Sequence, residues 1–569
     1  MDNRLTRGIQ TLRLTKNITL GVGRFAAWEL KRKRFFSDIK ALATKQPRDI
    51  SWSDLLEECA ADAPNKVFLR YNEEEFSYWR MNRNANKAAN LLLAAGGGKS
   101  KGVGVFMRNS PRFLEVFFGA QKAGMYTVTI NPEARGDGLA YIINHSDIEL
   151  LVVDAELLDT INAVADQLER VSPPNIIVDD IEPEAADYDI PDTMKRLSGA
   201  AAMPADRPDI QANPEDICLI IYTSGTTGPP KGVVYRYNTT GVNQLRLAGH
   251  FLLTKDDVYY TYLSLSHGNA LFISTTATMA ARATMGLSRK FSASRFWDHV
   301  RFYNATILNT IGSIVPILMK QPEKPNDRDN NVRIVLSAAC PADMWEPFEQ
   351  RFGVTIYEGY GAIDGGGKGI FNFGNAPKGS LGKPTSPGVR LIDENGSDVP
   401  PDVPGELVFK VGNKSSSVEY YKNEEASQKK IKDGLLYTGD ILRRDSKGYF
   451  YFVGRNTESM RKGGENVSAY EVEQVIMKHP AVEEVAVYAV PSEMIEDEIM
   501  AAIKVVEDQT LDPEALRRFL SDKLAKYAIP RYIRFVDDFP KTNTHRIIKA
   551  SLEKEGITDD TYDAANNKN

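Results

Sequence analysis

The sequence predicts an α/β protein built from more than one folding unit, and three observations lead to this prediction. The chain has 569 residues, which exceeds the size of a single ordinary core. From about residue 51, short apolar runs alternate with helix-like stretches, which is typical of a parallel sheet covered on both faces. After about residue 385 the runs become shorter and alternate with Gly, Pro and Asp turns. We therefore expect a large N-terminal domain of parallel α/β sheets, a small β-barrel-like subdomain and a small α+β C-terminal domain.

Composition excludes several classes of protein. The chain is 42% hydrophobic and 26% charged, with a mean hydropathy of -0.34, which excludes a collagen, a mostly disordered chain and a polytopic membrane protein. No run approaches the roughly 18 apolar residues of a spanning helix, and the N-terminus has no signal-peptide core. Cys59, Cys218 and Cys340 are too far apart, and odd in number, for a disulfide framework or a zinc site. These observations favour a reducing cytoplasm.

The first 50 residues form a basic arm. They contain twelve Lys and Arg residues and four acidic ones, a net charge of +8, although the whole chain carries -6. Apolar residues such as Trp28, Phe35 and Phe36 are interleaved with the basic ones. Residues 1–45 are therefore expected either to pack on the body as a solvated helix or to lie on an anionic membrane surface. The pI of about 5.8 argues against nucleic-acid binding.

The elements of the large domain follow in order. Trp79–Ala95 reads as a helix that ends at the glycines 96–98, because glycine is the usual residue after a helix C-terminus. A strand, a helix and two more strands follow, at Val103–Met107, Phe113–Ala123, Tyr126–Ile130 and Leu150–Val153. The strand pattern returns at Ile217–Thr223, Asp257–Leu263, Ala305–Ile311, Val332–Ser337 and Thr355–Glu358.

Beyond Gly454 the sequence predicts a compact α+β unit. Its expected elements are a helix at Ala469–Lys478, strands at Val485–Val490 and Ile499–Val506, a helix at Pro513–Leu524 and a strand at Tyr532–Val536. We divide the chain into a basic arm (1–50), a large domain (51–454), a small C-terminal domain (455–558) and a frayed tail (559–569).

The strongest local signal is the segment YTSGTTGPPKG at 222–232. An apolar strand runs directly into a loop of hydroxyls and glycines that ends at Lys231. Small residues let the backbone close around phosphate oxygens, hydroxyls and amides donate to them, and the lysine adds a positive charge. The segment therefore predicts a phosphate-binding loop, with contacts from Thr223, Ser224, Gly225, Thr226, Thr227, Gly228 and Lys231.

This loop resembles that of the adenylate-forming (AMP-binding) superfamily, which includes acyl-CoA synthetases. Further motifs stand in the expected order: Asn131-Pro132, Ser337–Pro341, Tyr360–Asp364, Tyr437–Asp440, Gly454-Arg455 and Lys462–Asn466. The resemblance covers about residues 50–553. Within the superfamily, the segments 290–297 and 463–468 look like the fatty-acid transport protein and very-long-chain acyl-CoA synthetase branch.

The resemblance implies a nucleotide site. Asp440 would accept the ribose hydroxyls, and Arg455 would reach the same nucleotide. Ala338, within the 337–341 motif, and Tyr360 with Gly361 would form the walls of the adenine pocket. His267 would contact or gate the acyl group, although a structural histidine is the alternative.

Two motifs depart from the superfamily pattern. Ile363 stands where relatives have a threonine that contacts the α-phosphate, and it cannot donate a hydrogen bond. Asp364 replaces the glutamate that helps to hold Mg²⁺, and we take it as the candidate metal residue, acting through water. Arg546 stands where relatives have a lysine that steadies the adenylating groups, and Lys549 is a second candidate for that role.

The resemblance implies an acid–thiol ligase that makes an acyl-CoA from a carboxylate, ATP and coenzyme A through an acyl-adenylate, with Mg²⁺. Similar enzymes rotate a mobile C-terminal domain between the two half-reactions; the hinge would lie near 456–457, with Gly463 and Gly464 along the pantetheine path. We expect a long-chain or very-long-chain fatty acid as substrate. The alternatives are another carboxylate (carnitine-like, bile-acid or aromatic), an enzyme that transfers the acyl group to a carrier protein, and a degenerate lipid-binding or uptake homologue. We expect a cytoplasmic location; attachment of the arm to the cytoplasmic face of a membrane and assembly into an oligomer are alternatives to a monomer in solution.

Overall fold

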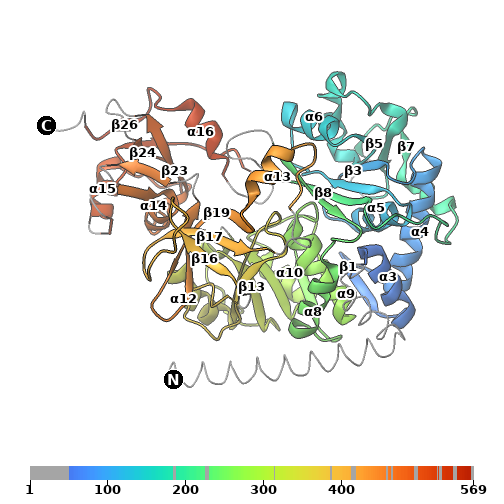
Figure 1. Ribbon diagram of the computed structural model, residues 1–569, viewed down its shortest axis with the longest axis horizontal. Coiled ribbons are helices and arrows are strands. Elements are labelled where there is room, and N and C mark those ends of the chain that lie inside the picture. The colour runs from blue at the N-terminus through green and yellow to red at the C-terminus, as the bar shows by residue number, and fades with distance from the viewer. Residues whose placement is uncertain are drawn as a thin grey trace.

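The protein is described from a computed structural model, which shows several sheets along one elongated body (Figure 1). The structure describes residues 50–182, 187–223, 230–312, 314–384, 387–411, 418–455, 459–462, 465–491, 497–521, 523–524, 528–541 and 547–565. The prediction for the arm at 1–45 therefore lies outside the described residues. Within them, no helix combines the length and the apolar character needed to cross a bilayer.

Seven strands form the first sheet: β3 (Gly102–Phe106), β4 (Tyr126–Thr129), β5 (Ile148–Asp154), β6 (Ile176–Asp179), β7 (Lys195–Arg196), β8 (Ile217–Thr223) and β9 (Lys231–Arg236). Their order across the sheet is β7-β6-β5-β3-β4-β8-β9. All neighbours run parallel except β8 and β9, which are antiparallel. Every residue of β3 is buried, as expected of a parallel strand that is covered on both faces.

Eight strands form the second sheet: β1 (Val67–Tyr71), β2 (Glu74–Ser77), β10 (Val258–Thr261), β11 (Thr284–Leu287), β12 (Ile307–Ile311), β13 (Ile334–Ala338), β14 (Ile356–Gly361) and β15 (Gly369–Asn372). Their order is β15-β14-β13-β12-β10-β11-β1-β2, parallel in the middle and antiparallel at both edges. The carboxyl ends of β12, β13 and β14 therefore meet at one edge of the sheet.

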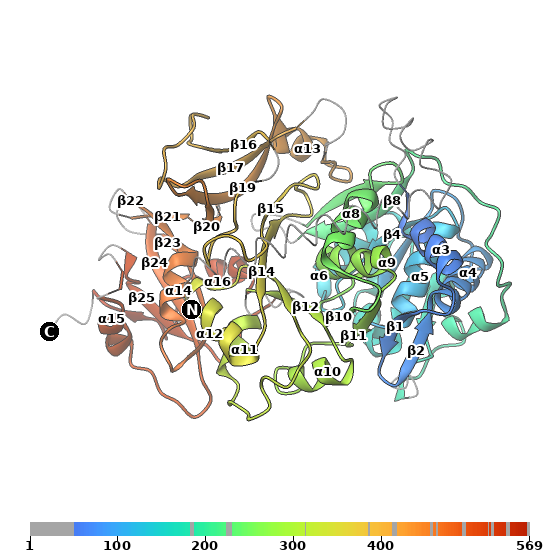
Figure 2. The same cartoon turned by 90° about the horizontal axis from the view of Figure 1, so that it is seen from below.

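The third sheet is antiparallel and contains β16 (Val389–Ile392), β17 (Gly405–Lys410), β18 (Ile431–Lys432), β19 (Leu435–Arg444) and β20 (Phe450–Arg455). The fourth sheet belongs to the C-terminal segment and contains β23 (Val482–Pro491), β24 (Asp497–Val505), β25 (Tyr532–Phe535) and β26 (Tyr562–Asp563). A separate hairpin precedes it, β21 (Ser459–Lys462) with β22 (Glu465–Ser468). In Figure 2 most of the third sheet lies above the C-terminal elements, and its strand β20 reaches the hairpin of β21 and β22.

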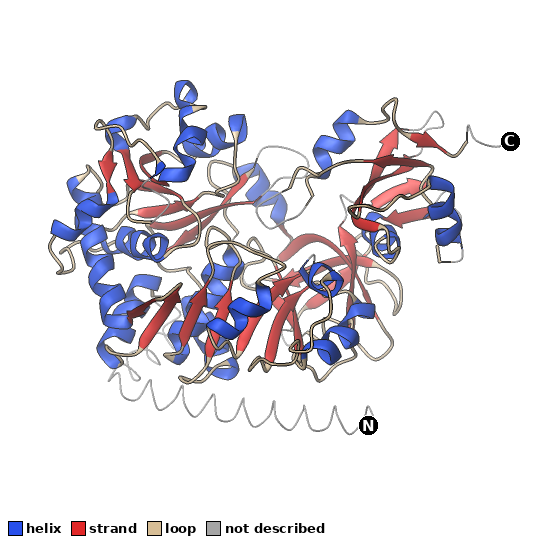
Figure 3. Cartoon of the chain, turned by 180° about the vertical axis from the view of Figure 1, so that it is seen from behind, coloured by secondary structure: helices blue, strands red, loops and turns tan. Residues whose placement is uncertain are grey.

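Helices flank the sheets (Figure 3). They are α3 (Trp52–Asp62), α4 (Tyr78–Ala94), α5 (Pro111–Lys122), α6 (Gly136–His145), α7 (Leu158–Asn162), α8 (Val242–Leu252), α9 (Thr276–Ala281), α10 (Phe296–Phe302), α11 (Ile314–Lys320), α12 (Ala342–Phe352), α13 (Glu424–Lys430), α14 (Ala469–Ile476), α15 (Pro513–Ser521) and α16 (Lys549–Glu555). A π-helix, η6, spans Asn269–Thr275, and short 3-10 turns lie at Ala155–Leu157, Ala165–Gln167, Pro173–Asn175 and Leu197–Ala202.

Two glycines allow close packing between helices. A Cβ on Gly119 of α5 would lie 2.8 Å from the carbonyl oxygen of Ala85 on α4. A Cβ on Gly249 of α8 would lie 2.9 Å from the Cα of Ala277 on α9. Any larger residue at either position would therefore push the two helices apart.

The buried cores are divided between the two ends of the chain. One cluster joins α3–α5 to the first two sheets, and it includes Trp52, Phe117 and Tyr260. The C-terminal segment has a cluster of its own, which includes Val487 and Leu516. Each end of the molecule thus buries its own apolar surface.

The predicted α/β fold class is confirmed, and the predicted helices and strands appear within a few residues of their expected ends. The helix expected at 79–95 is α4, and Gly96 follows it with a φ of +103°, as predicted for a glycine after a C-terminus. Part of the tail expected to fray is paired instead. β26 lies beside β25, and Asp563 accepts two hydrogen bonds from Arg531, at 2.8 and 3.0 Å.

Candidate active site

The ends of the predicted phosphate loop are held together by backbone pairing. Thr223, the last residue of β8, lies opposite Lys231, the first residue of β9, and its Oγ1 donates to the Lys231 carbonyl oxygen at 3.3 Å. Lys231 is exposed, and its Nζ lies 5.5 Å from the ring centroid of Tyr420. Ser224, Gly225, Thr226, Thr227 and Gly228 lie outside the described residues. The loop thus begins at the carboxyl end of a strand that is parallel to β4, where ligands bind in open α/β sheets.

A segment that precedes α13 pairs with the strand at the exit of this loop. The amide of Val234 donates to the carbonyl oxygen of Glu419 at 2.9 Å, and the amide of Tyr421 donates to that of Gly232 at 2.7 Å. We call residues 418–421 the strap. The strap adds a short antiparallel pairing to β9, so it fixes the third sheet against the first.

Tyr360 and Asp440, predicted to contact the base and the ribose, lie in direct contact. The Tyr360 hydroxyl donates to Asp440 Oδ2 at 2.5 Å. Tyr360 is near the end of β14, Gly361 is the last residue of that strand, and Asp440 is buried in β19. Asp440 also pairs in register with Arg455 of β20. This hydrogen bond joins the second sheet to the third through two residues that are 80 positions apart in sequence.

Ala338 ends β13 at the same edge of the second sheet. The next residue, Ala339, has a φ of +69°, a conformation that costs an alanine about 1–3 kcal/mol. Glu358, buried in β14, accepts hydrogen bonds from the amides of Ala339 and Cys340, the latter at 3.2 Å. Burial raises the pKa of Glu358 to about 7. Glu358 was not among the site residues predicted from the sequence. Its position at the end of an apolar strand could have indicated a role at the sheet edge where the site lies.

Asp364, the candidate metal residue, already has two partners. Its Oδ2 accepts a hydrogen bond from the Tyr420 hydroxyl at 2.6 Å and pairs with Lys430 Nζ at 2.8 Å. Burial raises the pKa of this carboxyl, but the Lys430 charge and the two hydrogen bonds outweigh burial and hold it below its usual range. Among the described residues, no group of three or more His, Cys, Asp or Glu side chains could hold a metal ion.

His267 lies beside the altered motif. Burial lowers its pKa to about 4, so the imidazole is neutral at pH 7. A Cβ on the next residue, Gly268, would lie 3.1 Å from Cγ1 and Cδ1 of Ile363 and 3.2 Å from Cδ2 of Phe272. The Ile363 side chain therefore faces Gly268 and η6, and its carbonyl oxygen accepts a hydrogen bond from Tyr235 at 2.7 Å. The structure thus places Ile363 on the predicted acyl side of the site.

Lys549, the C-terminal candidate whose side chain the structure describes, forms an ion pair within its own segment. Lys549, the first residue of α16, pairs with Glu473 of α14 at 2.7 Å. Arg546, Gly463 and Gly464 lie outside the described residues, and so does the Arg455 side chain. In this arrangement Lys549 is held within the C-terminal segment.

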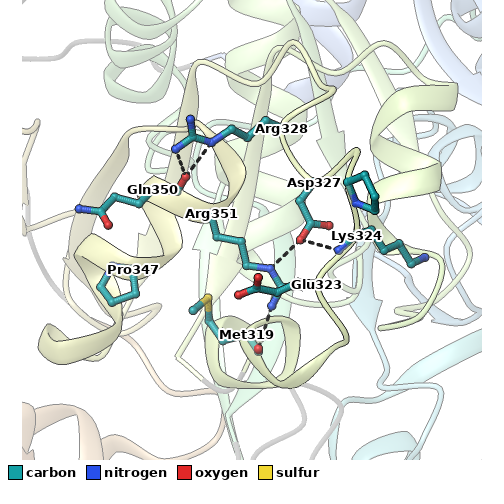
Figure 4. Close-up of a pocket in the computed structure, with 9 residues that line it drawn as sticks. Met319, Glu323, Lys324, Asp327, Arg328, Pro347, Gln350 and Arg351 are labelled. Atoms are coloured by element: carbon teal, nitrogen blue, oxygen red, sulfur yellow. Dashed lines mark hydrogen bonds and ion pairs between the residues drawn. The ribbon is translucent and has the colours of Figure 1, made fainter.

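A surface pocket of about 460 Å³ lies between α11 and α12, apart from the candidate residues (Figure 4). Its charged groups satisfy one another: Arg351 pairs with Asp327 at 2.7 Å and donates to the carbonyl oxygens of Met319 and Gln321, both at 2.9 Å. None of the predicted site residues lines this pocket. We therefore interpret this pocket as a network of ion pairs and hydrogen bonds that stabilises the fold.

Comparison with known proteins gives a consistent result. The AMP-binding enzyme family matches residues 56–417, and the AMP-binding enzyme C-terminal domain matches residues 471–546. A medium/long-chain-fatty-acid–CoA ligase of Mycobacterium marinum is 33% identical over 86% of this chain and 93% of that protein. A steroid-22-oyl-CoA synthetase of Rhodococcus jostii is 36% identical over 80% of this chain and 82% of that protein. ATP-bound MatB of Rhodopseudomonas palustris superposes with a TM-score of 0.74 at 25% identity, over 88% of this chain and 98% of that one.

Proposed function

The chain belongs to the AMP-binding enzyme family, and from that premise we propose that it is an ATP-dependent long-chain or very-long-chain fatty acyl-CoA synthetase. The observation that carries the proposal is the meeting of β14, β19 and the β8–β9 loop ends, which brings Tyr360, Asp440 and Lys231 to one region. As an acid–thiol ligase, the enzyme joins a carboxylate to coenzyme A and converts ATP to AMP and pyrophosphate through an acyl-adenylate.

In the first half-reaction, the substrate carboxylate attacks the α-phosphorus of ATP and pyrophosphate leaves. Thr223 and Lys231, with the loop between them, would hold the phosphates, and Tyr360, Ala338 and Asp440 would hold the nucleoside. Arg546 would stabilise the charge that develops on the phosphorus, with Lys549 as the second candidate. In the second half-reaction, the thiol of coenzyme A attacks the adenylate and AMP leaves.

The residue proposed for Mg²⁺ fits an ion that arrives with the nucleotide. Mg²⁺ commonly takes one or two carboxylates and completes its shell with phosphate oxygens and water. Asp364 supplies one carboxylate, half-buried and held in the charged form. When bound, the ion would neutralise charge on the phosphates, while Asp364 would orient it.

The acyl and thiol sides are assigned to different parts of the chain. Neutral His267 and the apolar side chain of Ile363 would face the acyl group, and Gly463 and Gly464 would line the pantetheine path. The domain bounds proposed from the sequence place the hinge at 456–457, after β20. A rotation there would exchange the C-terminal groups that face the adenylate.

The substrate class is tested by incubating the enzyme with ATP, Mg²⁺, coenzyme A and a mixed pool of carboxylic acids. The pool contains medium-, long- and very-long-chain fatty acids, steroid side-chain acids, aromatic acids and carnitine-like acids, and the thioesters are identified by mass spectrometry. We expect the thioesters of long-chain and very-long-chain acids to dominate. A dominant steroid or aromatic thioester would contradict the fatty-acid assignment, and pyrophosphate exchange at background with every acid would favour a degenerate lipid-binding protein.

We also propose that residues 1–45 contact an anionic membrane. Their positive charge and interleaved aromatic residues support this role. Deleting them should reduce co-sedimentation with anionic vesicles and leave turnover on a water-soluble acid unchanged. Equal sedimentation of the deleted and full chains would refute membrane contact.

A further inference from the structure

Lys430 lies where three of the elements assigned to the nucleotide meet. It is the last residue of α13 and comes directly before β18, the edge strand of the third sheet. Its Nζ lies 2.8 Å from Asp364 Oδ2, in the segment after β14, and 3.5 Å from the carbonyl oxygen of Thr438 in β19. The Lys430 side chain is only 13% exposed. The structure therefore holds one ammonium between the end of β14 and the Thr438–Asp440 part of β19.

The surroundings of this ammonium are acidic. Asp364 contacts it directly, and Glu406 of β17 accepts a hydrogen bond from the Gly439 amide of β19 at 3.0 Å. Asp440 is the next residue of β19. A triphosphate would bring further negative charge to a place where carboxylates already converge. Binding of the triphosphate there requires a cation that compensates the negative charge and that has an N–H group available for the phosphate oxygens.

Lys430 can supply such an N–H group, whereas the side chain that follows the neighbouring strand, β14, cannot. An ammonium carries three N–H donors, and the contacts with Asp364 and Thr438 use two of them. Ile363, the residue beside Asp364, has no side-chain donor and faces Gly268. Another lysine of this group, Lys231, has its Nζ 5.5 Å from the centroid of the Tyr420 ring, whose hydroxyl donates to Asp364.

We propose that Lys430 is a phosphate-binding residue of this enzyme, which contacts the triphosphate of ATP while it remains beside Asp364. This inference rests on the proposed function. It adds a cation from the third sheet to a phosphate site that the sequence assigned to the 223–231 loop and the C-terminal segment. The triphosphate would then be held by Lys231 at the start of β9 and by Lys430 at the end of α13, both of which lie near Tyr420 or its partner Asp364.

The test is titration calorimetry of the full chain with ATP and, separately, with adenosine, in magnesium buffer without acid substrate. Lys430→Met should weaken ATP binding by about tenfold or more, because a buried charged hydrogen bond is lost. Adenosine binding should stay unchanged, because it carries no phosphate. Lys430→Arg should recover most of the ATP affinity.

Lys429→Met is the matched control. Lys429 is the preceding residue of α13, its side chain is 75% exposed, and it pairs only with Glu425, at 2.6 Å, among its described contacts. This variant should bind ATP like the parent. If it weakened ATP binding as much as Lys430→Met does, a general surface-charge effect would replace the proposal.

Two further outcomes overturn the inference. Equal ATP affinity of Lys430→Met and the parent would exclude a phosphate contact. Equal weakening of ATP and adenosine would show that Lys430 only maintains the shape of the site. Should the methionine variant fail to unfold cooperatively, Lys430→Gln replaces it in the same titrations. A parent enzyme that binds no ATP would instead refute the proposed function itself.

Discussion

The nucleotide side of the molecule and the C-terminal segment are built in opposite ways. On the nucleotide side, polar contacts join elements that are distant in sequence, as the bond between Tyr360 and Asp440 does. In the C-terminal segment, 465–565, ion pairs such as Lys549 with Glu473 join elements of the same segment, which also has its own apolar core. One side is therefore a junction between sheets, and the other is a self-contained unit.

This difference bears on the two half-reactions. The Tyr360–Asp440 contact is complete without any residue of the C-terminal segment. Several contacts link the two parts. Lys478 pairs with Asp343 at 3.4 Å, Lys320 of α11 donates to the carbonyl oxygens of Val482 and Glu483, and the rings of Phe452 and Tyr470 lie 5.4 Å apart. The contact between Tyr360 and Asp440 therefore forms without the C-terminal segment, whereas any rotation of that segment would have to break the contacts that link it to α11, α12 and β20.

The largest effect is expected from Asp440→Ala. The substitution removes the acceptor of the Tyr360 hydroxyl and the proposed ribose contact, and ATP binding should weaken by about 3 kcal/mol, or on the order of 100-fold. Titration calorimetry measures the loss. Asp402→Ala, which removes an exposed carboxylate paired with Arg443 at 3.1 Å, serves as the control. Equal ATP affinity of the Asp440 variant and the parent would show that the Tyr360–Asp440 contact is not part of the nucleotide site.

Glu358→Gln should change how stability depends on pH. The pKa of Glu358 is about 7 in the folded protein, against an ordinary value of 4.5, so the folded state binds the proton more tightly. This group therefore stabilises the fold below about pH 4.5, and its contribution is lost as the pH rises through 7.

The size of this effect can be measured by thermal or urea unfolding. Between about pH 5 and pH 7, the parent should lose about 2 kcal/mol of unfolding free energy relative to Glu358→Gln. The glutamine cannot ionise, and it keeps one acceptor oxygen where the Ala339 and Cys340 amides use the two carboxylate oxygens, so it lowers stability by an amount that does not depend on pH. Parallel pH profiles for the two proteins would contradict the assignment.

The smallest effect is expected from Lys549→Met. Breaking the half-buried pair with Glu473 should lower the unfolding free energy of the C-terminal segment by about 1 kcal/mol and leave ATP binding unchanged. Lys554→Met, at an exposed position of α16, is the control. Weaker ATP binding in the Lys549 variant would show that this lysine acts at the nucleotide. The C-terminal segment would then be part of the nucleotide site and not separate from it.

The sequence predicted the fold class and many of the strands in their order along the chain, because apolar runs and glycine signals are local, but it did not indicate β1, β2, β6, β7, β9 or β11. It could not predict which sheet each strand joins, because that depends on crossovers between distant strands. The paired strand β26 was missed for the same reason. Its two residues show no strand pattern, and β25 supplies the partner.

The site shows the same limit. Tyr360 and Asp440 were singled out from motifs, and the structure places them in contact. Lys430 was not singled out, because a lysine beside Lys429 in a polar helix reads as a solvated charge. Its partner, Asp364, is 66 positions away, and no spacing rule connects them. The role predicted for Asp364 stays a prediction.

The strap has a mechanical consequence. Its amides and carbonyls are shared with β9, so the exit of the phosphate loop and the start of α13 belong to one hydrogen-bonded ribbon. Tightening of that loop around a ligand would pull on the barrel-like layer as well. A reporter group attached to the outer surface of α13 could therefore sense occupancy without touching the pocket.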